Sequence, residues 1–387
     1  MNLQPLLDAI NDRNIVSGLT HDIYRYPARF SPLFARTAIE LFTEPGDSIL
    51  DPFMGGSTSL VEALALGRHA VGTDLNQLAV FLARVKTLLV TDEDLESLRI
   101  WAELIAPELS PRKPVVRHTY YQALGYQTNM PWRFRKIAEQ AINSAMDLLE
   151  GDLLLSARCI ILKTVQWAVD CKKALPTAAE FRAKIVEDTR LVADGLKALR
   201  QQVDSLQQKP ATIEAHHCAT DSIGSLKSKL LQCRPPRLVV TSPPYPGVHV
   251  LYHRWQVLGR RETAAPYWIT ESNDGQGGSF YTFCDRRRLD HDEKYFGRLF
   301  SCFTAIRSVV PDDCVVAQLV GFARPNEQLA LYLDAMSRAG FAPFEFKGSS
   351  RPSQEEFWRA VPNRKWYNNV RHAVRQSKEI LLLHRAR

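Results

Sequence analysis

The clearest pattern in the sequence is an alternation of short apolar runs with longer periodic segments. Residues 48–51, Ser-Ile-Leu-Asp, form an apolar run that ends in an acid, and a glycine-rich turn follows directly. A helical spacing of apolar residues then runs from Ser59 and closes at Gly67. Residues 69–74 read as a second buried strand that also ends in an acid. This order of strand, glycine turn, helix, strand and acid predicts the opening of a doubly wound α/β sheet.

A different pattern occupies the stretch from about 85 to 210. It has helix-length periodic segments, few β-rich runs, and two candidate capping boxes that begin at Thr91 and Thr177. Strand-like runs return after it, at 212–216, 238–241, 314–320, 341–346 and 379–383. We therefore predict three parts: residues 1–84, a mainly helical insertion at 85–210, and residues 211–387, which complete the sheet.

Composition narrows the function classes without naming one. The 387 residues are 45% hydrophobic and 24% charged, which is typical of a globular protein. The net charge of +7 favours an acidic or polyanionic partner. No apolar run is long enough to span a bilayer, and no secretory signal pattern begins the chain. The seven cysteines include no C-x-x-C pair, so we expect neither a disulfide framework nor a zinc cluster, and we expect a cytoplasmic location.

The first candidate site lies at residues 51–58, Asp-Pro-Phe-Met-Gly-Gly-Ser-Thr. Glycines between a strand and a helix let a cofactor approach the backbone closely. Asp74 ends the next strand, where an acid can accept hydrogen bonds from ribose hydroxyls. The G-x-G-x-x-G fingerprint and the P-loop pattern are both absent. Taken alone, the motif is also compatible with a packing turn in another α/β protein.

The second candidate site is Thr-Ser-Pro-Pro-Tyr at residues 241–245, directly after an apolar strand. Two prolines fix the backbone and remove two amide donors, which leaves carbonyls as pure acceptors. With the Ser242 hydroxyl, these carbonyls can hold an amino group by its hydrogens, while Tyr245 offers a flat face for a base. Alone, this motif is also compatible with a rigid turn that caps a strand.

Together, residues 51–58 and 242–245 resemble the two motifs of the DNA amino-methyltransferases, D-P-F-x-G-x-G-T and (D/N/S)-P-P-(Y/F). Residues 21–32 are similar to the segment that precedes the first motif and helps enclose the methionine end of the cofactor. The resemblance implies a Rossmann-like class I methyltransferase sheet, mostly parallel with an antiparallel last strand, that carries the helical insertion. It departs at Ser57, where the family has glycine, and the effect on cofactor affinity is open.

The resemblance also implies S-adenosyl-L-methionine as cofactor and assigns roles to residues. The implied catalytic residues are Ser242, Pro243, Pro244 and Tyr245. The implied cofactor-binding residues are Tyr24, Ala28, Phe30, Asp51, Pro52, Phe53, Gly55, Gly56, Ser57, Thr58, Asp74, Leu75 and Asp221. For Asp221, a contact with the adenine amino group and a simple helix N-cap both remain open.

The implied reaction is methylation of an exocyclic base amine in double-stranded DNA, by direct in-line transfer to a flipped base. The serine in the second motif favours cytosine N4 over adenine N6, and no cysteine follows a proline as carbon methylation would require. Basic residues that we expect to contact DNA are Arg254, Arg260, Arg261, Arg286, Arg287, Lys365 and Arg371, although each is also compatible with a solvated surface. We expect the insertion to pack beside the cleft and recognise sequence.

Several alternatives remain at this stage. An RNA base amino-methyltransferase uses similar motifs, a protein-amide methyltransferase generally has Asn where Ser242 stands, and an inactive DNA-binding assembly factor would keep the fold. No metal site is expected at 216–218, because adjacent strand residues point to opposite faces. A nucleoid-associated enzyme with a separate restriction endonuclease fits the pattern. The recognition sequence and oligomeric state stay open.

Overall fold

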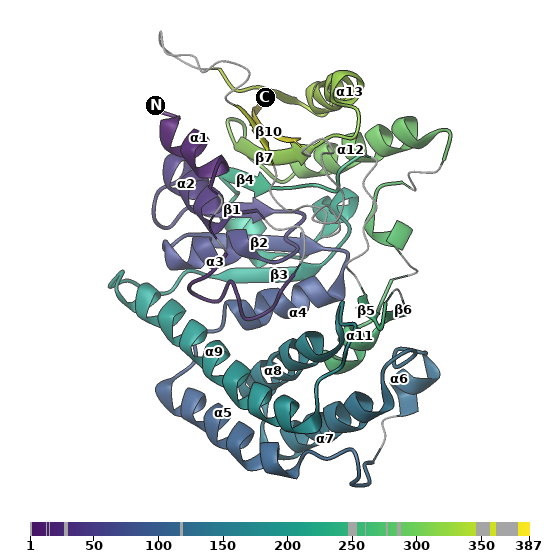
Figure 1. Cartoon of the computed structure of the whole chain (residues 1–387). Coiled ribbons are helices and arrows are strands. Elements are labelled where there is room, and N and C mark those ends of the chain that lie inside the picture. Colours follow the sequence, from purple (N-terminus) through teal and green to yellow (C-terminus); the bar gives the residue numbers. More distant parts are fainter. Residues whose placement is uncertain are drawn as a thin grey trace.

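A mixed sheet with a helical unit beside it forms the framework of the protein (Figure 1). The computed structural model describes residues 2–12, 14, 16–26, 30–116, 119–246, 254–259, 261–275, 278–284, 288–345, 357–360 and 378–387. In this part of the chain, no helix is long and apolar enough to cross a membrane.

The main sheet has the strand order β3-β2-β1-β4-β7-β10-β8. Its strands are β1 (Ser48–Asp51), β2 (His69–Asp74), β3 (Ile213–His217), β4 (Leu238–Thr241), β7 (Val315–Gly321), β8 (Phe341–Pro343) and β10 (Lys378–Ala386), and β9 (Trp358–Ala360) pairs with β10. Neighbours from β3 to β7 are parallel, whereas β10 runs antiparallel to both β7 and β8. This confirms the Rossmann-like class I methyltransferase sheet, with its antiparallel strand inserted before the edge.

Alternate residues of the central strands face two helical layers, as the two-residue period of a strand requires. Ile49 and Val240 pack in one cluster with the first helices, and Leu50 and Val239 pack in another with the later helices. The first layer is α1 (Gln4–Ile10), α2 (Pro32–Phe42), α3 (Thr58–Ala65) and α4 (Gln77–Lys86). The second is α10 (Lys229–Cys233), α12 (His291–Arg307) and α13 (Pro325–Arg338). Both faces of the parallel strands are therefore buried, which explains why these strands are continuous apolar runs.

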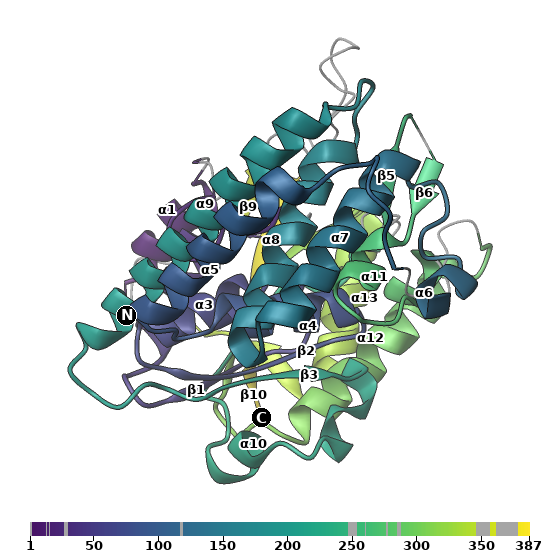
Figure 2. The ribbon, with the colours of Figure 1, turned by 90° about the horizontal axis from the view of Figure 1, so that it is seen from below.

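The helical unit lies in the crossover between β2 and β3 (Figure 2). It consists of α5 (Asp92–Ile105), η1 (Ala106–Glu108), α6 (Thr119–Ala123), α7 (Trp132–Leu148), α8 (Gly151–Val169) and α9 (Ala178–Asp204). The capping boxes predicted at Thr91 and Thr177 are both formed, and they start α5 and α9. Within the unit, α9 packs against α5 and α8, and α7 packs against α8.

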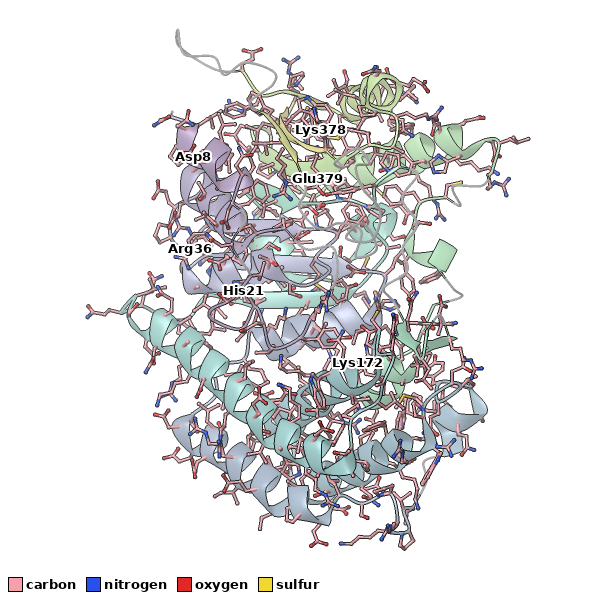
Figure 3. The ribbon with its side chains drawn as sticks, in the orientation of Figure 1. Asp8, His21, Arg36, Lys172, Lys378 and Glu379 are labelled. Atoms are coloured by element: carbon pink, nitrogen blue, oxygen red, sulfur yellow. The ribbon has the colours of Figure 1, made fainter. Side chains whose placement is uncertain are left out.

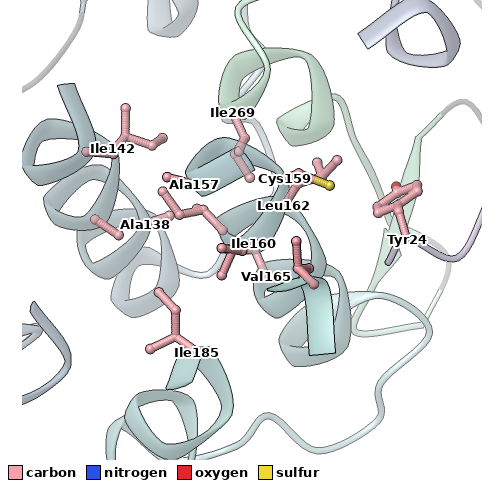
Figure 4. Close-up of a cluster of buried hydrophobic side chains, with 14 of the residues drawn as sticks. Tyr24, Ala138, Ile142, Ala157, Cys159, Ile160, Leu162, Val165, Ile185 and Ile269 are labelled. Carbon is pink, nitrogen blue, oxygen red and sulfur yellow. The ribbon is translucent and has the colours of Figure 1, made fainter. Parts of the chain in front are cut away.

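The helical unit does not have a core of its own. Its buried cluster includes Ile160 of α8 and Ile185 of α9, and it continues into Leu78 and Leu82 of α4. Figure 4 shows the same cluster reaching Tyr24 and Ile269, from parts of the chain far outside the helical unit. The unit and the sheet domain therefore share one hydrophobic core on the α4 side.

Some elements differ from the pattern-based expectation. A hairpin of β5 (Trp255–Val257) and β6 (Arg261–Thr263) is followed by α11 (Ala265–Ile269), and neither was predicted. Two further short 3-10 helices, η2 (Thr220–Ser225) and η3 (Gly278–Tyr281), complete the described elements. Strand β8 is shorter than the predicted run and β10 is longer, because β10 pairs along its length with β7. All seven cysteines are free.

Candidate active site

Two sequence motifs meet at the carboxyl edge of adjacent strands β1 and β4. Parallel strands end at the same edge of a sheet, and ligands of open α/β sheets bind there. The turn after β1, the acid at the end of β2, the segment after β3 and the Ser-Pro-Pro-Tyr turn after β4 all lie at this edge.

Asp51 joins the two motifs inside the protein. Its side chain is buried, and its carboxylate accepts hydrogen bonds from Ser59 Oγ on α3 and from Thr241 Oγ1 on β4, the latter at 2.7 Å. The Phe53 amide also donates to it, at 3.2 Å. Burial raises the pKa of Asp51 to about 6, against these hydrogen bonds. The carboxylate thereby ties the turn at residues 52–57 to β4, the strand that precedes the Ser-Pro-Pro-Tyr turn. We call these two turns the cofactor turn and the catalytic turn, after the roles that the resemblance implies.

The glycine turn at residues 55–57 packs closely against Tyr26. Gly55 has φ +43°, and a Cβ there would lie 3.3 Å from Tyr26 Cε1. Ser57, where the family pattern has glycine, also takes a left-handed conformation with φ +64° and ψ +25°. Its hydroxyl is buried without a hydrogen-bond partner. Beneath the turn, the buried side chain of Lys86 donates to the Gly56 carbonyl at 2.8 Å.

Asp74 holds the opposite side of the same turn. Its carboxylate accepts the Gly55 amide at 2.9 Å and the Asn76 amide at 2.8 Å. Burial raises the pKa of Asp74 to about 6. The residue remains partly exposed, so its carboxylate can accept further hydrogen bonds from a ligand.

The segment at 21–26 is fixed from both sides. Buried His21 contacts Glu62 of α3 through Nε2 at 2.6 Å, and Arg36 Nε binds the other oxygen of Glu62 at 2.8 Å; Figure 3 labels His21 and Arg36 on this side of the molecule. From the helical unit, Lys163 Nζ donates to the Asp22 carbonyl at 2.8 Å and Gln166 Nε2 to the Arg25 carbonyl at 3.1 Å. Helix α8 therefore helps to place the segment that lies over the cofactor turn.

In the second motif, the contacts of Ser242 leave its hydroxyl oxygen able to accept a hydrogen bond from an incoming group. Its Oγ lies 3.0 Å from the Leu319 carbonyl oxygen and 3.0 Å from the Tyr245 hydroxyl. A carbonyl can only accept, so the single Ser242 proton is directed to Leu319, and the lone pairs of Oγ are left for other donors. A serine in this geometry presents an acceptor, as a carboxamide oxygen would.

An aromatic chain connects the two motifs beneath the site. Tyr295 of α12 is buried, and its hydroxyl donates to the Pro244 carbonyl. Phe283 lies between Tyr295 and Phe53 of the cofactor motif, with ring centroids 5.3 Å and 5.7 Å away respectively. Tyr295 thus engages one of the two proline carbonyls of the catalytic turn.

A hydrogen-bonded network extends from Asn76, at the start of α4, to Arg254. Buried Asn76 caps α4 and accepts from the Tyr267 hydroxyl at 3.1 Å. The Tyr281 hydroxyl lies 3.2 Å from that of Tyr267 and donates to Asp274 at 2.9 Å. Asp274 in turn binds Arg254 Nε at 2.7 Å. Arg254, predicted to contact DNA, is therefore already paired with a carboxylate.

Other predicted residues have mixed placements. Tyr24 is buried and its hydroxyl accepts from Trp255 Nε1 at 3.0 Å, so Tyr26 rather than Tyr24 lies against Gly55. Phe30 packs in the core against Phe34. Pro52 and Thr58 are buried, Leu75 is partly buried, and Arg261 is exposed on β6. Ala28, Arg260, Arg286, Arg287, Lys365 and Arg371 lie outside the described residues.

Asp221 lies in the 3-10 helix η2, which follows β3. Its neighbour Thr220 donates to the Pro52 carbonyl at 2.8 Å, which holds this segment against the cofactor turn. The Asp221 carboxylate is exposed, and the N-cap position of its 3-10 helix is Ala219. The N-cap alternative is therefore wrong.

The sequence motifs did not include several residues that shape the site. These are Asn76, Lys86, Tyr267, Asp274, Phe283 and Tyr295. Asn76 had a recognisable signal, since asparagine directly before an apolar helical segment is a typical N-cap. The others are ordinary core or loop residues in sequence, and only the tertiary fold brings them to the site.

Comparison with known proteins finds similarity in the amino-terminal part of the chain. Residues 8–84 match a family model described as DNA methylase. The Type II methyltransferase M.MvaI of Kocuria varians is 40% identical over 96 residues, which is 22% of this chain and 21% of that protein. M.MjaII of Methanocaldococcus jannaschii is 33% identical over 66 residues, 17% of this chain and 12% of that protein. The amino-terminal part of the chain is similar to DNA amino-methyltransferases, and the chain spans about a fifth or less of the length of these relatives.

Two solved structures are more distant. TrmN from Thermus thermophilus aligns over 93% of this chain and 50% of its own, with a TM-score of 0.34 and 12% identity. The rRNA methyltransferase aviRa from Streptomyces viridochromogenes aligns over 100% of this chain and 93% of its own, with a TM-score of 0.35 and 11% identity. The order and direction of the strands, rather than these alignments, identify the fold of the protein.

The residues of the site fit S-adenosylmethionine, the methyl donor of the family that the motifs resemble. Asp74 is partly exposed and its carboxylate can accept ribose hydroxyls, and Asp221 is exposed and its carboxylate can accept an adenine amino group. The Ser57 hydroxyl, buried without a partner, belongs to the turn between β1 and α3. Within the described residues, no cluster of three or more His, Cys, Asp or Glu side chains is placed to hold a metal ion.

Proposed function

We propose that the protein is a DNA methyltransferase that methylates an exocyclic amino group of a base, with cytosine N4 favoured over adenine N6. The observation that carries the proposal is the junction of the two motifs through Asp51 and Thr241, which fixes a cofactor turn beside an acceptor-rich Ser-Pro-Pro-Tyr turn. The match of residues 8–84 to the DNA methylase family model supports DNA as the substrate.

The catalytic turn would bind and orient the amine. Ser242 Oγ and the Pro243 carbonyl accept its two hydrogens, while the Leu319 carbonyl keeps the Ser242 proton out of the way. The nitrogen lone pair then points along the line of transfer, and fixed carbonyl dipoles stabilise the positive charge that develops on nitrogen. Bound S-adenosylmethionine supplies an electrophilic methyl group on a sulfonium.

Tyr245 and Asp74 would have separate tasks. Tyr245 offers its ring to the base once the base has left the helix, and Asp74 holds the cofactor ribose. The nitrogen forms its bond to the methyl carbon as the carbon–sulfur bond breaks, and the surplus proton leaves to water. No strong general base is needed, because the methylated amine is acidic enough to lose that proton readily.

Single-molecule sequencing of genomic DNA tests the proposal. The chain is expressed in a host that lacks DNA methylation, beside a Ser242→Ala variant as control. A modified cytosine at one short sequence, absent with the variant, is the expected result. A modified adenine would correct the base. No DNA modification by a protein that still binds S-adenosylmethionine would overturn DNA as the substrate and favour RNA.

A further inference from the structure

The β5–β6 hairpin is fixed at its root on three sides. Trp255 is 2% exposed and donates from Nε1 to the Tyr24 hydroxyl at 3.0 Å. The end of α8 binds the strand through the Cys171 amide, which donates to the Gln256 carbonyl at 2.7 Å. On the other strand, Asn129 Nδ2 donates to the Glu262 carbonyl at 2.8 Å. The hairpin is therefore a rigid projection shared by the sheet domain and the helical unit.

The described residues at the tip of this hairpin are Leu258 and Gly259, and both have positive φ angles. Leu258 is 47% exposed, although the preceding Val257 is 1% exposed. Leu258 has φ +44° and Gly259 has φ +107°, so a bulky residue occupies a conformation that favours glycine. A strained residue persists where the surrounding structure holds it, and such residues cluster at ligand sites.

Cations flank the tip. Arg261 is exposed on β6, and Lys172 lies in an isolated bridge with Val257 while Lys173 beside it is exposed. Figure 3 labels Lys172 on the side of the molecule where the parallel strands end. Two acids are nearby, but the Asp170 carboxylate accepts the Gln256 amide at 2.9 Å, and Glu262 is partly buried on β6. The three cations Lys172, Lys173 and Arg261 therefore outnumber the two acids near the tip.

We infer that the β5–β6 hairpin is a wedge that enters double-stranded DNA beside the target base. Leu258 inserts between base pairs to support extrusion of the base, and Lys172, Lys173 and Arg261 contact the phosphates on either side. An apolar side chain on a rigid tip with cations around it has the chemistry that separates stacked bases while holding the backbone. This inference rests on the proposed DNA methylation, and it assigns a part of base extrusion to a defined element.

Methylation of two matched duplexes tests the role of Leu258. Once sequencing has given the recognition sequence, one duplex carries the target base paired and the other carries it opposite an abasic position. For Leu258→Ala, we expect about a tenfold lower rate on the paired duplex and a rate within about twofold of the native protein on the unpaired one, because extrusion is then no longer opposed by pairing. Leu104→Ala, an equally bulky exposed leucine on α5, is the control and should change neither rate.

A salt titration tests the cations. The double substitution Lys172→Ala and Lys173→Ala should lower the slope of log affinity against log salt by about one to two. Lys209→Ala, exposed beyond α9, should leave it unchanged. Unaltered S-adenosylmethionine affinity shows that each variant is folded.

The outcomes separate the inference from the function. The wedge inference is wrong if the native protein methylates DNA and Leu258→Ala methylates the paired duplex as fast as the native protein does. It is also wrong if Leu258→Ala is slowed by the same factor on both duplexes. In either case the proposed function stands. If the native protein modifies only RNA, both are wrong.

Discussion

Ser57 shows how one side chain departs from the family pattern without abandoning its geometry. The residue keeps the left-handed backbone of the glycine that it replaces, at φ +64°, and buries a hydroxyl without a partner. A left-handed conformation costs a residue with a Cβ about 1 kcal/mol, and glycine avoids this cost. The retained serine therefore suggests a partner for its hydroxyl in the cofactor complex.

The substitution Ser57→Gly separates the two effects. We expect the ligand-free variant to be more stable by about 1 kcal/mol, measured by thermal unfolding, because the strain and the unpaired hydroxyl are both removed. We expect its affinity for S-adenosylmethionine to fall, measured by titration calorimetry. Ser57→Val adds a branched side chain at the same position and should lose both stability and binding. A destabilised Ser57→Gly protein would contradict this account.

At Asp74, cofactor binding should depend on pH. Burial raises the pKa of this carboxyl to about 6 in the unliganded protein. Ribose hydroxyls donate to the charged form, so bound cofactor favours the carboxylate and protonation opposes binding. Affinity should therefore be constant above about pH 7 and fall below about pH 6, by at most about tenfold per pH unit for one proton.

The control for this prediction is Asp74→Asn. This variant should bind S-adenosylmethionine more weakly at pH 8 and should lose most of the fall between pH 6 and pH 5. A dissociation constant of the native protein that stays flat from pH 8 to pH 5 would rule out a protonation at Asp74 linked to binding.

Helix α12 positions the catalytic turn from below. Tyr295 donates to the Pro244 carbonyl, and Phe283 links its ring to Phe53. In Tyr295→Phe the ring remains but the carbonyl loses its donor, which costs about 1 kcal/mol or more for a buried acceptor. We expect the methylation rate to fall about fivefold with an unchanged affinity for S-adenosylmethionine.

Tyr332→Phe is a matched control for this prediction. The Tyr332 hydroxyl donates to Gln318 at 2.6 Å in the same buried cluster and does not bond the catalytic turn. Both variants should lose similar stability in thermal unfolding, but only Tyr295→Phe should lose rate. Equal rate losses would assign the effect to the core in general.

At the level of elements, the sequence predicts the strands and helices that depend on a local pattern of residues. The strands β1, β2 and β4, the helix after the glycine turn and both capping boxes follow from periodicity and cap residues. The β5–β6 hairpin was missed because its strands are three residues each and its turn has Leu258 where a turn signal would have glycine or asparagine. Tyr295 and Lys86 were missed because their partners are far away in the chain, and no local spacing indicates such contacts.

On the scale of the whole molecule, the helical unit shares its hydrophobic core with the sheet domain. The sequence predicts only that the unit packs beside the cleft and recognises sequence, as a separate recognition domain could. However, Ile160 and Ile185 share a cluster with Leu78 and Leu82, and α8 holds the segment at 21–26 through Lys163 and Gln166. The unit can take part in recognition and still be required for the fold.

Deletion of the unit tests this view. Replacement of residues 92–204 by a short flexible linker should expose the apolar face of α4 and give a protein that is unfolded or aggregated, because a cluster of this size is lost. Circular dichroism and S-adenosylmethionine binding report the result. A soluble deletion protein that binds S-adenosylmethionine with native affinity would show that the unit is dispensable for folding.

The hydrogen bond between Asp51 and Thr241 has a consequence for synthesis. It joins residues 190 positions apart, because the helical unit separates the strands that carry them. A ribosome that adds 5–20 residues each second needs about 10 to 40 s to pass from one to the other. During that interval the acid of the cofactor motif has emerged without its partner on β4. The nascent chain therefore contains the cofactor turn well before the whole site can form. Under the proposed function, it can methylate only after β4 has docked beside β1.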